Sequence, residues 1–213
     1  MPFFNGLHGL VHYRRWPVQR PSAVVVLLHG LGQQSADYRH FNRFLNRYDI
    51  DVWAIDHIGH GLSEGDAARV APVEHLAAHT VQLLERVRRE IPEAPLALIG
   101  HSLGAGTALI TMGSESAAVR SVSAVALTGT PNKVLELNTP APPVPTLVLH
   151  GQDDRRAHLD PIRTWSATRP TVTMREFPDA GHDLLHEPVR HAVAGALLGF
   201  LTSHLLDPAA RTT

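Results

Sequence analysis

A serine flanked by glycines follows a short apolar run near the middle of the chain. The run Leu96–Ile99 leads into Gly100-His101-Ser102-Leu103-Gly104, and a helix-compatible register continues from Thr107 to Met112. A serine on such a sharp strand-to-helix turn exposes its hydroxyl, and glycines are needed because side chains two residues to either side would collide with the neighbouring backbone. Ser102 is therefore the candidate nucleophile.

A histidine and an acidic pair, each placed after another predicted strand, could activate that hydroxyl. His182 follows the strand predicted at 171–177, and its imidazole could act as general base and then protonate a leaving group. Asp153 and Asp154 follow the strand predicted at 145–150, where a carboxylate can accept a hydrogen bond from an imidazole. The pattern does not choose between the two aspartates, and such a pair also suits a turn or a helix N-cap.

Small residues follow the first strongly apolar run of the chain. Ala23–Leu28 predicts a buried strand, and His29-Gly30-Leu31-Gly32 comes directly after it. Glycines there let the backbone fold back, so that the N–H of Leu31 could pair with that of Leu103 to hold an oxyanion. Gly30 and His101 are then expected to border the substrate. An ordinary glycine-rich turn is the alternative.

These motifs lie at strand ends in a chain that alternates strands and helices. Further elements are predicted as an edge strand or hairpin at 9–17, strands at 50–55 and 122–127, and helices at 37–48, 72–90, 161–167 and 188–206. Repeated β-α units predict a mostly parallel sheet with helices on both faces, in which ligands bind beyond the carboxyl ends of the strands. We expect residues 1–213 to form one domain with a flexible tail at 207–213, because this length suits one sizeable core.

Composition narrows the classes of partner. The formal net charge is −1, so no basic surface for nucleic acid is expected, and the absence of cysteine removes disulfides and thiolate chemistry. His75 and His79, like His182 and His186, are four residues apart, but without a further ligand set we expect no metal and no cofactor.

The ends of the chain give no sign of a membrane protein. The apolar run at 197–206 is short and interrupted, so it is expected to dock onto the sheet rather than to form an integral membrane segment. The first residues lack the pattern of a signal peptide, and cytoplasmic localisation is the expectation. Homo-oligomerisation is left open.

Together, the motifs resemble an α/β-hydrolase of the monoacylglycerol lipase and lysophospholipase branch, which includes serine aminopeptidase S33-like relatives. The matching segments are His29-Gly-Leu-Gly with Tyr38 downstream, Asp56-His-Ile-Gly-His-Gly-Leu-Ser63, Gly100-His-Ser-Leu-Gly104, His150-Gly-Gln-Asp-Asp154 and Gly181-His-Asp-Leu-Leu-His-Glu187. The resemblance implies the α/β-hydrolase fold, with Ser102 as nucleophile and His182 as base. It also implies Asp154 as the acid, because the acid of the family falls three residues after a glycine, here Gly151.

The sequence departs from these relatives in two places. Ile58 stands where relatives commonly carry arginine, so a polar role of that side chain is lost. Relatives insert a helical cap after the strand at 122–127, whereas only seventeen residues, Thr128 to Val144, separate it here from the next strand. Several are prolines, which leaves space for little beyond one short helix near Lys133 to Leu137. A minimal or absent lid is therefore expected.

The leading functional hypothesis is a serine hydrolase that cleaves short-to-medium acyl esters or monoacylglycerol-like substrates through an acyl-serine intermediate. A thioesterase or acyltransferase would use the same three side chains, and a non-catalytic ligand-binding protein on the same fold is a third reading. His186 and Glu187 are expected either to orient the loop that carries His182 or to cap the last helix.

Overall fold

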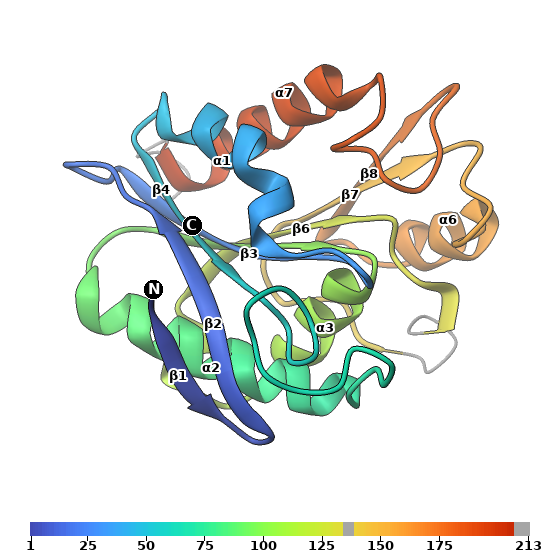
Figure 1. Ribbon diagram of the computed structural model, residues 1–213. Helices are drawn as coiled ribbons and strands as arrows, with labels where there is room; N and C mark the ends of the chain where they lie inside the picture. The colour runs from blue at the N-terminus through green and yellow to red at the C-terminus, as the bar shows by residue number, and fades with distance from the viewer. Residues whose placement is uncertain (134–138, 207–213) are drawn as a thin grey trace.

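The computed structural model describes residues 1–133 and 139–206, which are arranged around one eight-stranded sheet (Figure 1). The strand order is β1-β2-β4-β3-β5-β6-β7-β8. Strands β1 and β2 pair antiparallel as an N-terminal hairpin, and β2 pairs antiparallel with β4, whereas every pair from β4 through β8 is parallel. The strands are β1 (Phe3–Gly6), β2 (Gly9–Trp16), β3 (Ala23–Leu28), β4 (Ile50–Ile55), β5 (Leu96–His101), β6 (Val122–Thr128), β7 (Thr146–Gly151) and β8 (Val172–Phe177).

Helices cover both faces of this sheet. One face carries η1 (Ser35–Tyr38), α1 (Arg39–Asn46), α7 (Arg190–Leu201) and its extension η2 (Thr202–Leu206), and the other carries α2 (Val73–Glu90), α3 (Leu103–Thr111), α4 (Ala117–Arg120) and α6 (Leu159–Ala167) (Figure 1). The predicted mostly parallel sheet with helices on both faces is confirmed. Short helix α4 was not predicted, and the helix predicted at 37–48 begins with the 3₁₀ turn η1.

The residues of β3 show how the sheet separates two cores. Side chains alternate between the faces of a strand, so Val24, Val26 and Leu28 pack with α2 and α3, while Val25 and Leu27 pack with α1 and α7. All six residues of this strand are buried. A continuous Val/Leu run is therefore what this position requires, because neither face of the strand meets water.

The apolar C-terminal segment docks onto the sheet as predicted. Val193, Leu197 and Leu201 of α7, followed by Leu205 of η2, are fully buried in the core that Val25 and Leu27 of β3 also line. No helix in the described part of the chain is long and apolar enough to cross a membrane. The tail predicted at 207–213 lies outside the described residues, as does all of the short helix predicted at 133–137 except Lys133, which is helical.

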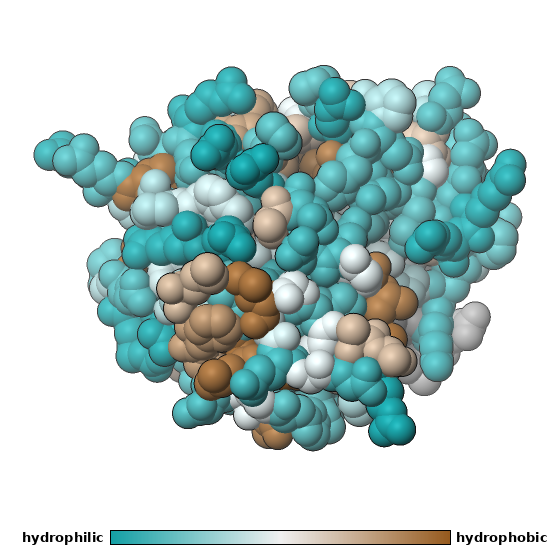
Figure 2. Space-filling view, in the orientation of Figure 1, coloured by the Kyte–Doolittle hydropathy of each residue, from teal (hydrophilic) through white to brown (hydrophobic). Residues whose placement is uncertain are grey.

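The connection between β6 and β7 is short, as the sequence predicted. Its described parts, 129–133 and 139–145, contain no cap helix. Much of the face in Figure 2 is hydrophilic, with an apolar patch at the lower left over the β1–β2 hairpin, where Met1, Phe3 and Leu10 are exposed.

Candidate active site

The turn between β5 and α3 presents Ser102 in a strained conformation. Its backbone has φ 51° and ψ −115°, a region that costs a residue other than glycine about 1–3 kcal/mol. The backbone N–H of Ser102 donates to the carbonyl oxygen of Thr128 at 2.9 Å. The strand, the helix and this cross-strand bond together fix the serine at the carboxyl edge of the sheet.

The glycines of this turn are required by backbone packing, as the sequence predicted. A Cβ at Gly100 would collide with the carbonyl group of Gly104, and a Cβ at Gly104 would collide with the carbonyl groups of Leu28 and His29. The start of α3 therefore lies directly against the end of β3. This close approach brings the Ser102 turn next to the loop that carries Leu31.

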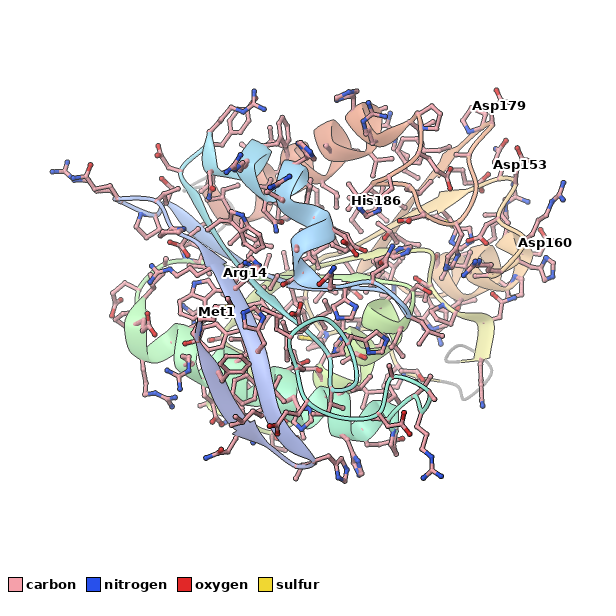
Figure 3. The ribbon with its side chains drawn as sticks, viewed as in Figure 1. Met1, Arg14, Asp153, Asp160, Asp179 and His186 are labelled. Atoms are coloured by element: carbon pink, nitrogen blue, oxygen red, sulfur yellow. The ribbon has the colours of Figure 1, made fainter. Side chains whose placement is uncertain are left out.

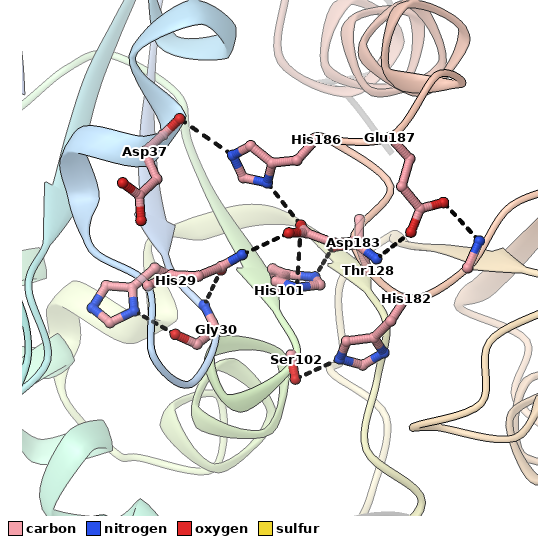
Figure 4. Close-up of polar contacts among 12 residues, drawn as sticks. His29, Gly30, Asp37, His101, Ser102, Thr128, His182, Asp183, His186 and Glu187 are labelled. Atoms are coloured by element: carbon pink, nitrogen blue, oxygen red, sulfur yellow. Dashed lines mark hydrogen bonds and ion pairs between the residues drawn. The ribbon is translucent and has the colours of Figure 1, made fainter. Parts of the chain in front are cut away.

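His182 and Asp154 complete a hydrogen-bonded relay with the serine. The Nε2 atom of His182 lies 2.8 Å from Ser102 Oγ (Figure 4). Its Nδ1 atom lies 2.7 Å from Asp154 Oδ2. A carboxylate can only accept, so Nδ1 carries the proton and Nε2 is left to accept from the serine hydroxyl. Three side chains more than 25 residues apart along the chain thus meet above the sheet.

The environment of Asp154 keeps this carboxyl ionised. Burial acts to raise its pKa, but hydrogen bonds from His182 and from the N–H groups of Arg156 and Ala157 outweigh burial, and the net pKa is lowered. His150 adds a fourth neighbour, with Nε2 at 3.3 Å from Asp154 Oδ2. An ionised carboxylate here can stabilise an imidazolium at position 182.

The structure separates the two adjacent aspartates that the sequence left open. The side chain of Asp154 is buried and bonded to His182, whereas Asp153 is exposed at the periphery of the molecule (Figure 3). Gly151 explains how the loop reaches this position, because a Cβ there would collide with the carbonyl groups of Ala180 and Gly181. The Asp154 loop and the His182 loop are therefore packed backbone to backbone.

The two residues whose N–H groups the sequence predicts as oxyanion donors, Leu31 and Leu103, lie in the turns after β3 and β5. Leu103 is the first residue of α3, so its N–H has no partner within the helix, and Leu31 lies on the exposed turn after β3. The side chain of Leu31 is 54% exposed, which leaves this turn accessible from solvent. A developing negative charge near Leu103 would also face the positive end of the α3 dipole.

His29 anchors the turn that carries Leu31. Its Nδ1 donates to the carbonyl oxygen of Gly30 at 2.7 Å, and its Nε2 accepts from the N–H of His57 at 2.9 Å. Burial lowers the pKa of His29 to about 4, so the ring is neutral and can both donate and accept. Ile58 follows His57 in the loop after β4, and its side chain is buried in the core. It stands at the position where an arginine is expected in relatives.

His101 is buried beneath the site. Its side chain is 5% exposed, its Nδ1 lies 3.0 Å from Thr128 Oγ1, and its ring packs 5.1 Å from that of His182. A Cβ at Gly30 would lie 2.8 Å from the His101 ring, so the two residues are in close contact. Burial lowers the pKa of His101 to about 4, and the neutral ring fills the space between the Leu31 turn and His182.

Glu187 holds the loop that carries His182. One carboxylate oxygen accepts from the N–H of Gly181 at 2.6 Å and the other from the N–H of Asp183 at 2.9 Å (Figure 4). These two N–H groups are those immediately before and after His182. Of the two roles the sequence left open for Glu187, orienting this loop is the one its contacts provide.

Sequence reasoning missed two side chains of this region, Gln33 and Asp183. Gln33 bonds to the backbone of its own turn, through Gly30, and to Asp183 across the site. The first contact is of the short-range kind that amide side chains often make. The second joins positions 150 residues apart and leaves no local pattern. Among the described residues, no group of three or more metal-binding side chains is arranged to hold an ion.

The sheet, the two helical layers and the serine turn define an α/β-hydrolase fold. The family model described as "Serine aminopeptidase, S33" matches residues 19–143, more than half of the sequence, and the chain belongs to this family. A solved serine hydrolase without lid from Xanthomonas campestris superposes with a TM-score of 0.80 at 19% identity, covering 97% of this chain and 94% of that one. A monoglyceride lipase from Saccharomyces cerevisiae superposes with a TM-score of 0.81 at 15% identity, covering 96% and 95%.

Sequence relatives include several monoglyceride lipases. The human monoglyceride lipase is 34% identical over 99 residues, which is 46% of this chain and 33% of the human protein. The monoacylglycerol lipase of Mycolicibacterium smegmatis is 30% identical over 105 residues, which is 48% of this chain and 38% of that protein. The matched part thus spans between a third and two fifths of the length of these relatives.

Proposed function

We propose that the chain is a carboxylic-ester hydrolase that forms an acyl intermediate on Ser102. The relay from Asp154 through His182 to Ser102, with distances of 2.7 and 2.8 Å, carries this proposal. A serine hydroxyl is a weak nucleophile until an adjacent base removes its proton. The order of donors and acceptors along the relay is the one that makes His182 such a base.

In the first half of the reaction, Ser102 Oγ attacks the carbonyl carbon of the ester while its proton passes to His182 Nε2. The N–H groups of Leu31 and Leu103 stabilise the negative charge that develops on the carbonyl oxygen. Asp154 stabilises the imidazolium and stays ionised. The bond from the carbonyl carbon to the alcohol oxygen then breaks, and His182 returns the proton to the departing alkoxide.

In the second half, water replaces the alcohol. Its oxygen adds to the acyl carbon as its proton passes to His182, and the tetrahedral intermediate collapses with cleavage of the bond to Ser102 Oγ. The serine recovers its proton from the imidazolium, and the carboxylic acid departs. The cycle consumes one ester and one water and leaves the protein unchanged.

The open surroundings of Ser102 support small or extended esters as substrates. The described parts of the β6–β7 connection contain no cap helix, which supports substrates that reach Ser102 directly from solvent. A cavity of about 580 Å³ borders the Leu31 turn and is lined in part by Leu31, His60 and Val70. We assign short-to-medium acyl esters, including monoacylglycerols, because the sequence relatives are named monoglyceride and monoacylglycerol lipases.

Turnover of a p-nitrophenyl ester series from acetate to laurate tests the proposal. The wild-type chain should release p-nitrophenol with a preference below the longest acyl chains, and Ser102→Ala should abolish turnover. Ser203→Ala, which changes an exposed serine on η2, is the matched control and should retain full activity. Absence of wild-type turnover, or equal turnover by Ser102→Ala, would overturn the proposal. Faster acylation by acyl-CoA thioesters than by oxygen esters would replace it with a thioesterase.

A further inference from the structure

The side-chain amide of Gln33 connects two loops on opposite sides of Ser102. Its Oε1 accepts from the N–H of Gly30 at 2.9 Å and from the hydroxyl of Tyr38 at 2.6 Å, and its Nε2 donates to Asp183 Oδ2 at 2.9 Å. The orientation of the amide is fixed by its partners, because a backbone N–H can only donate and a carboxylate can only accept. Gly30 adjoins Leu31, and Asp183 adjoins His182.

Asp183 is the point at which this connection meets the rest of the site. Its Oδ1 accepts from His186 Nδ1 at 2.7 Å and lies 3.6 Å from His101 Nε2 (Figure 4). Burial acts to raise the pKa of Asp183, but the hydrogen bond from His186 and the neighbouring imidazoles outweigh it, so the carboxyl is ionised. One carboxylate thus contacts side chains next to the Leu31 turn, the Ser102 turn and the histidine loop.

The sheet cannot fix the distance between these loops by itself. The Leu31 turn follows β3 and the histidine loop follows β8, and β5, β6 and β7 lie between them in the sheet. Strand spacing places β3 and β8 about 19 Å apart at about 4.8 Å per strand. The two loops therefore lean toward each other over the carboxyl edge, where Gln33 and Asp183 join them directly.

We propose that Gln33 and Asp183 are positioning residues that set the Leu31 N–H against the ester carbonyl while His182 engages Ser102. This proposal rests on the esterase function proposed above. The oxyanion donors act most strongly in the transition state, so a displaced Leu31 N–H lowers kcat more than it raises KM. The open site binds the ester only loosely in the ground state, so ground-state binding is little affected.

Exchange of the two hydrogen-bonding partners tests the proposal. In Gln33→Glu, two carboxylates face each other, although the new side chain still accepts from Gly30 and Tyr38. In Asp183→Asn, one amide oxygen replaces two carboxylate oxygens, so the new NH2 group must face one of the two groups that donate to Asp183, Gln33 Nε2 or His186 Nδ1. Turning the Gln33 amide over would take the acceptor away from the Gly30 N–H. In the double variant, the amide introduced at position 183 donates to the carboxylate introduced at position 33, and its oxygen still accepts from His186. All the hydrogen bonds of this Gln33–Asp183 brace are then present, and only the bond between positions 33 and 183 has its direction reversed.

Each single variant should lower kcat on p-nitrophenyl butyrate about 10-fold, less than the loss of a whole oxyanion donor, with KM changed less than about 2-fold. The double variant should recover kcat to within about 3-fold of wild type. A purely structural role would move thermal unfolding midpoints in parallel with kcat, so midpoints are measured for all variants. Gln19→Glu, the same change at an exposed glutamine, is the matched control.

Unchanged kcat in both single variants would overturn the proposal. So would a double variant whose loss of kcat equals the product of the losses in the two single variants. Absence of ester turnover by the wild-type chain would instead overturn the proposed function. The rate at which a fluorophosphonate labels Ser102 still tests the positioning role in that case. Negative charge also develops on the phosphoryl oxygen during labelling, and the Leu31 N–H is proposed to stabilise this charge. Equal labelling rates in wild type and both single variants, or no labelling at all, would reject it.

Discussion

The turn that carries Ser102 and the loop that carries His182 reach the same point in space but are held there by different means. Ser102 lies between a buried strand and a helix, and its glycine neighbours press backbone against backbone. His182 lies between β8 and α7, where Asp154, Glu187 and Asp183 fix the loop through side-chain hydrogen bonds. The first arrangement is steric and local, and the second is polar and assembled from distant residues.

This contrast predicts different consequences for mutations in the two regions. Changes at the serine turn should act on folding, because a backbone collision cannot be relieved without moving the sheet. Changes at the histidine loop should act on turnover with smaller costs in stability, because a loop can shift when one hydrogen bond is lost.

The largest effect is expected at Asp154, in the histidine region. Asp154→Asn should lower kcat by about 10³- to 10⁴-fold, because the amide favours the wrong tautomer of His182. Asp153→Asn, a change of the same kind at the exposed neighbour, should leave kcat within about 2-fold. Steady-state kinetics on p-nitrophenyl butyrate measure both. Similar losses in the two variants would show that the acid was misassigned.

The comparison of wild type with Asp154→Asn also gives a pH test of the histidine region. The folded-state pKa of Asp154 is lowered, so its ionisation contributes stability above the pKa of the unfolded chain, and that stability disappears as pH falls through the folded value. The stability difference between wild type and Asp154→Asn should therefore shrink as pH is lowered from 7 toward 3. Urea unfolding across this range measures it, and a constant difference would contradict the predicted linkage.

A large effect on stability is expected in the serine region. Gly104→Ala should lower the free energy of unfolding by about 3 kcal/mol, because its Cβ would collide with the backbone of Leu28 and His29. Gly195→Ala has no atom within 4 Å of the new Cβ and lies inside α7, so it should raise stability by about 0.5–1 kcal/mol. Chemical denaturation distinguishes the two. Equal shifts would mean that backbone packing does not hold the serine turn.

A moderate effect on turnover is expected at Glu187. Glu187→Gln keeps one acceptor and turns an amide donor toward one of the N–H groups beside His182. The free energy of unfolding should fall by about 1–3 kcal/mol and kcat by about 10-fold. Glu74→Gln, at an exposed position in the first turn of α2, is the control for the same chemical change. Full activity in Glu187→Gln would show that His182 is held without this carboxylate.

The smallest effect is expected at His186, on the rim of the histidine region. The hydrogen bond to Asp183 raises the pKa of His186, so its contribution to stability is present below the unfolded value and is lost as pH rises through the folded value. His186→Gln should cost at most about 0.5 kcal/mol at pH 5.5 and less at pH 8. His191→Gln is the control, and urea midpoints at the two pH values provide the measurement. A larger cost at pH 8 would reverse the predicted sign.

The serine turn could be predicted from the sequence because its requirements are local. Gly100, Ser102 and Gly104 fall within five residues, and the apolar strand before them and the helix after them supply the context. The buried strands were equally predictable, since continuous Val/Leu runs indicate burial on both faces. These parts of the fold need no knowledge of what lies across the molecule.

The contacts of Glu187 and Asp183 that hold the histidine loop could not be predicted, because they depend on how distant loops meet. The sequence placed Glu187 near His182 without choosing its role, and it gave no reason to connect Gln33 with Asp183. Asp154 was separated from Asp153 only by resemblance to a family, because burial and exposure of adjacent residues are set by the path of the loop. The role of Glu187 and the choice between the two aspartates therefore depend on the tertiary structure and not on the local sequence pattern.

The short β6–β7 connection has a consequence for engineering this scaffold. Because β6 and β7 are parallel, the connection leaves β6 at the carboxyl edge that carries Ser102 and enters β7 at the opposite edge, so a folded segment spliced directly after residue 129 would emerge over the face that carries Ser102. Selectivity could thus be added as a removable module, with Ser102, the sheet and the helical layers left as they are.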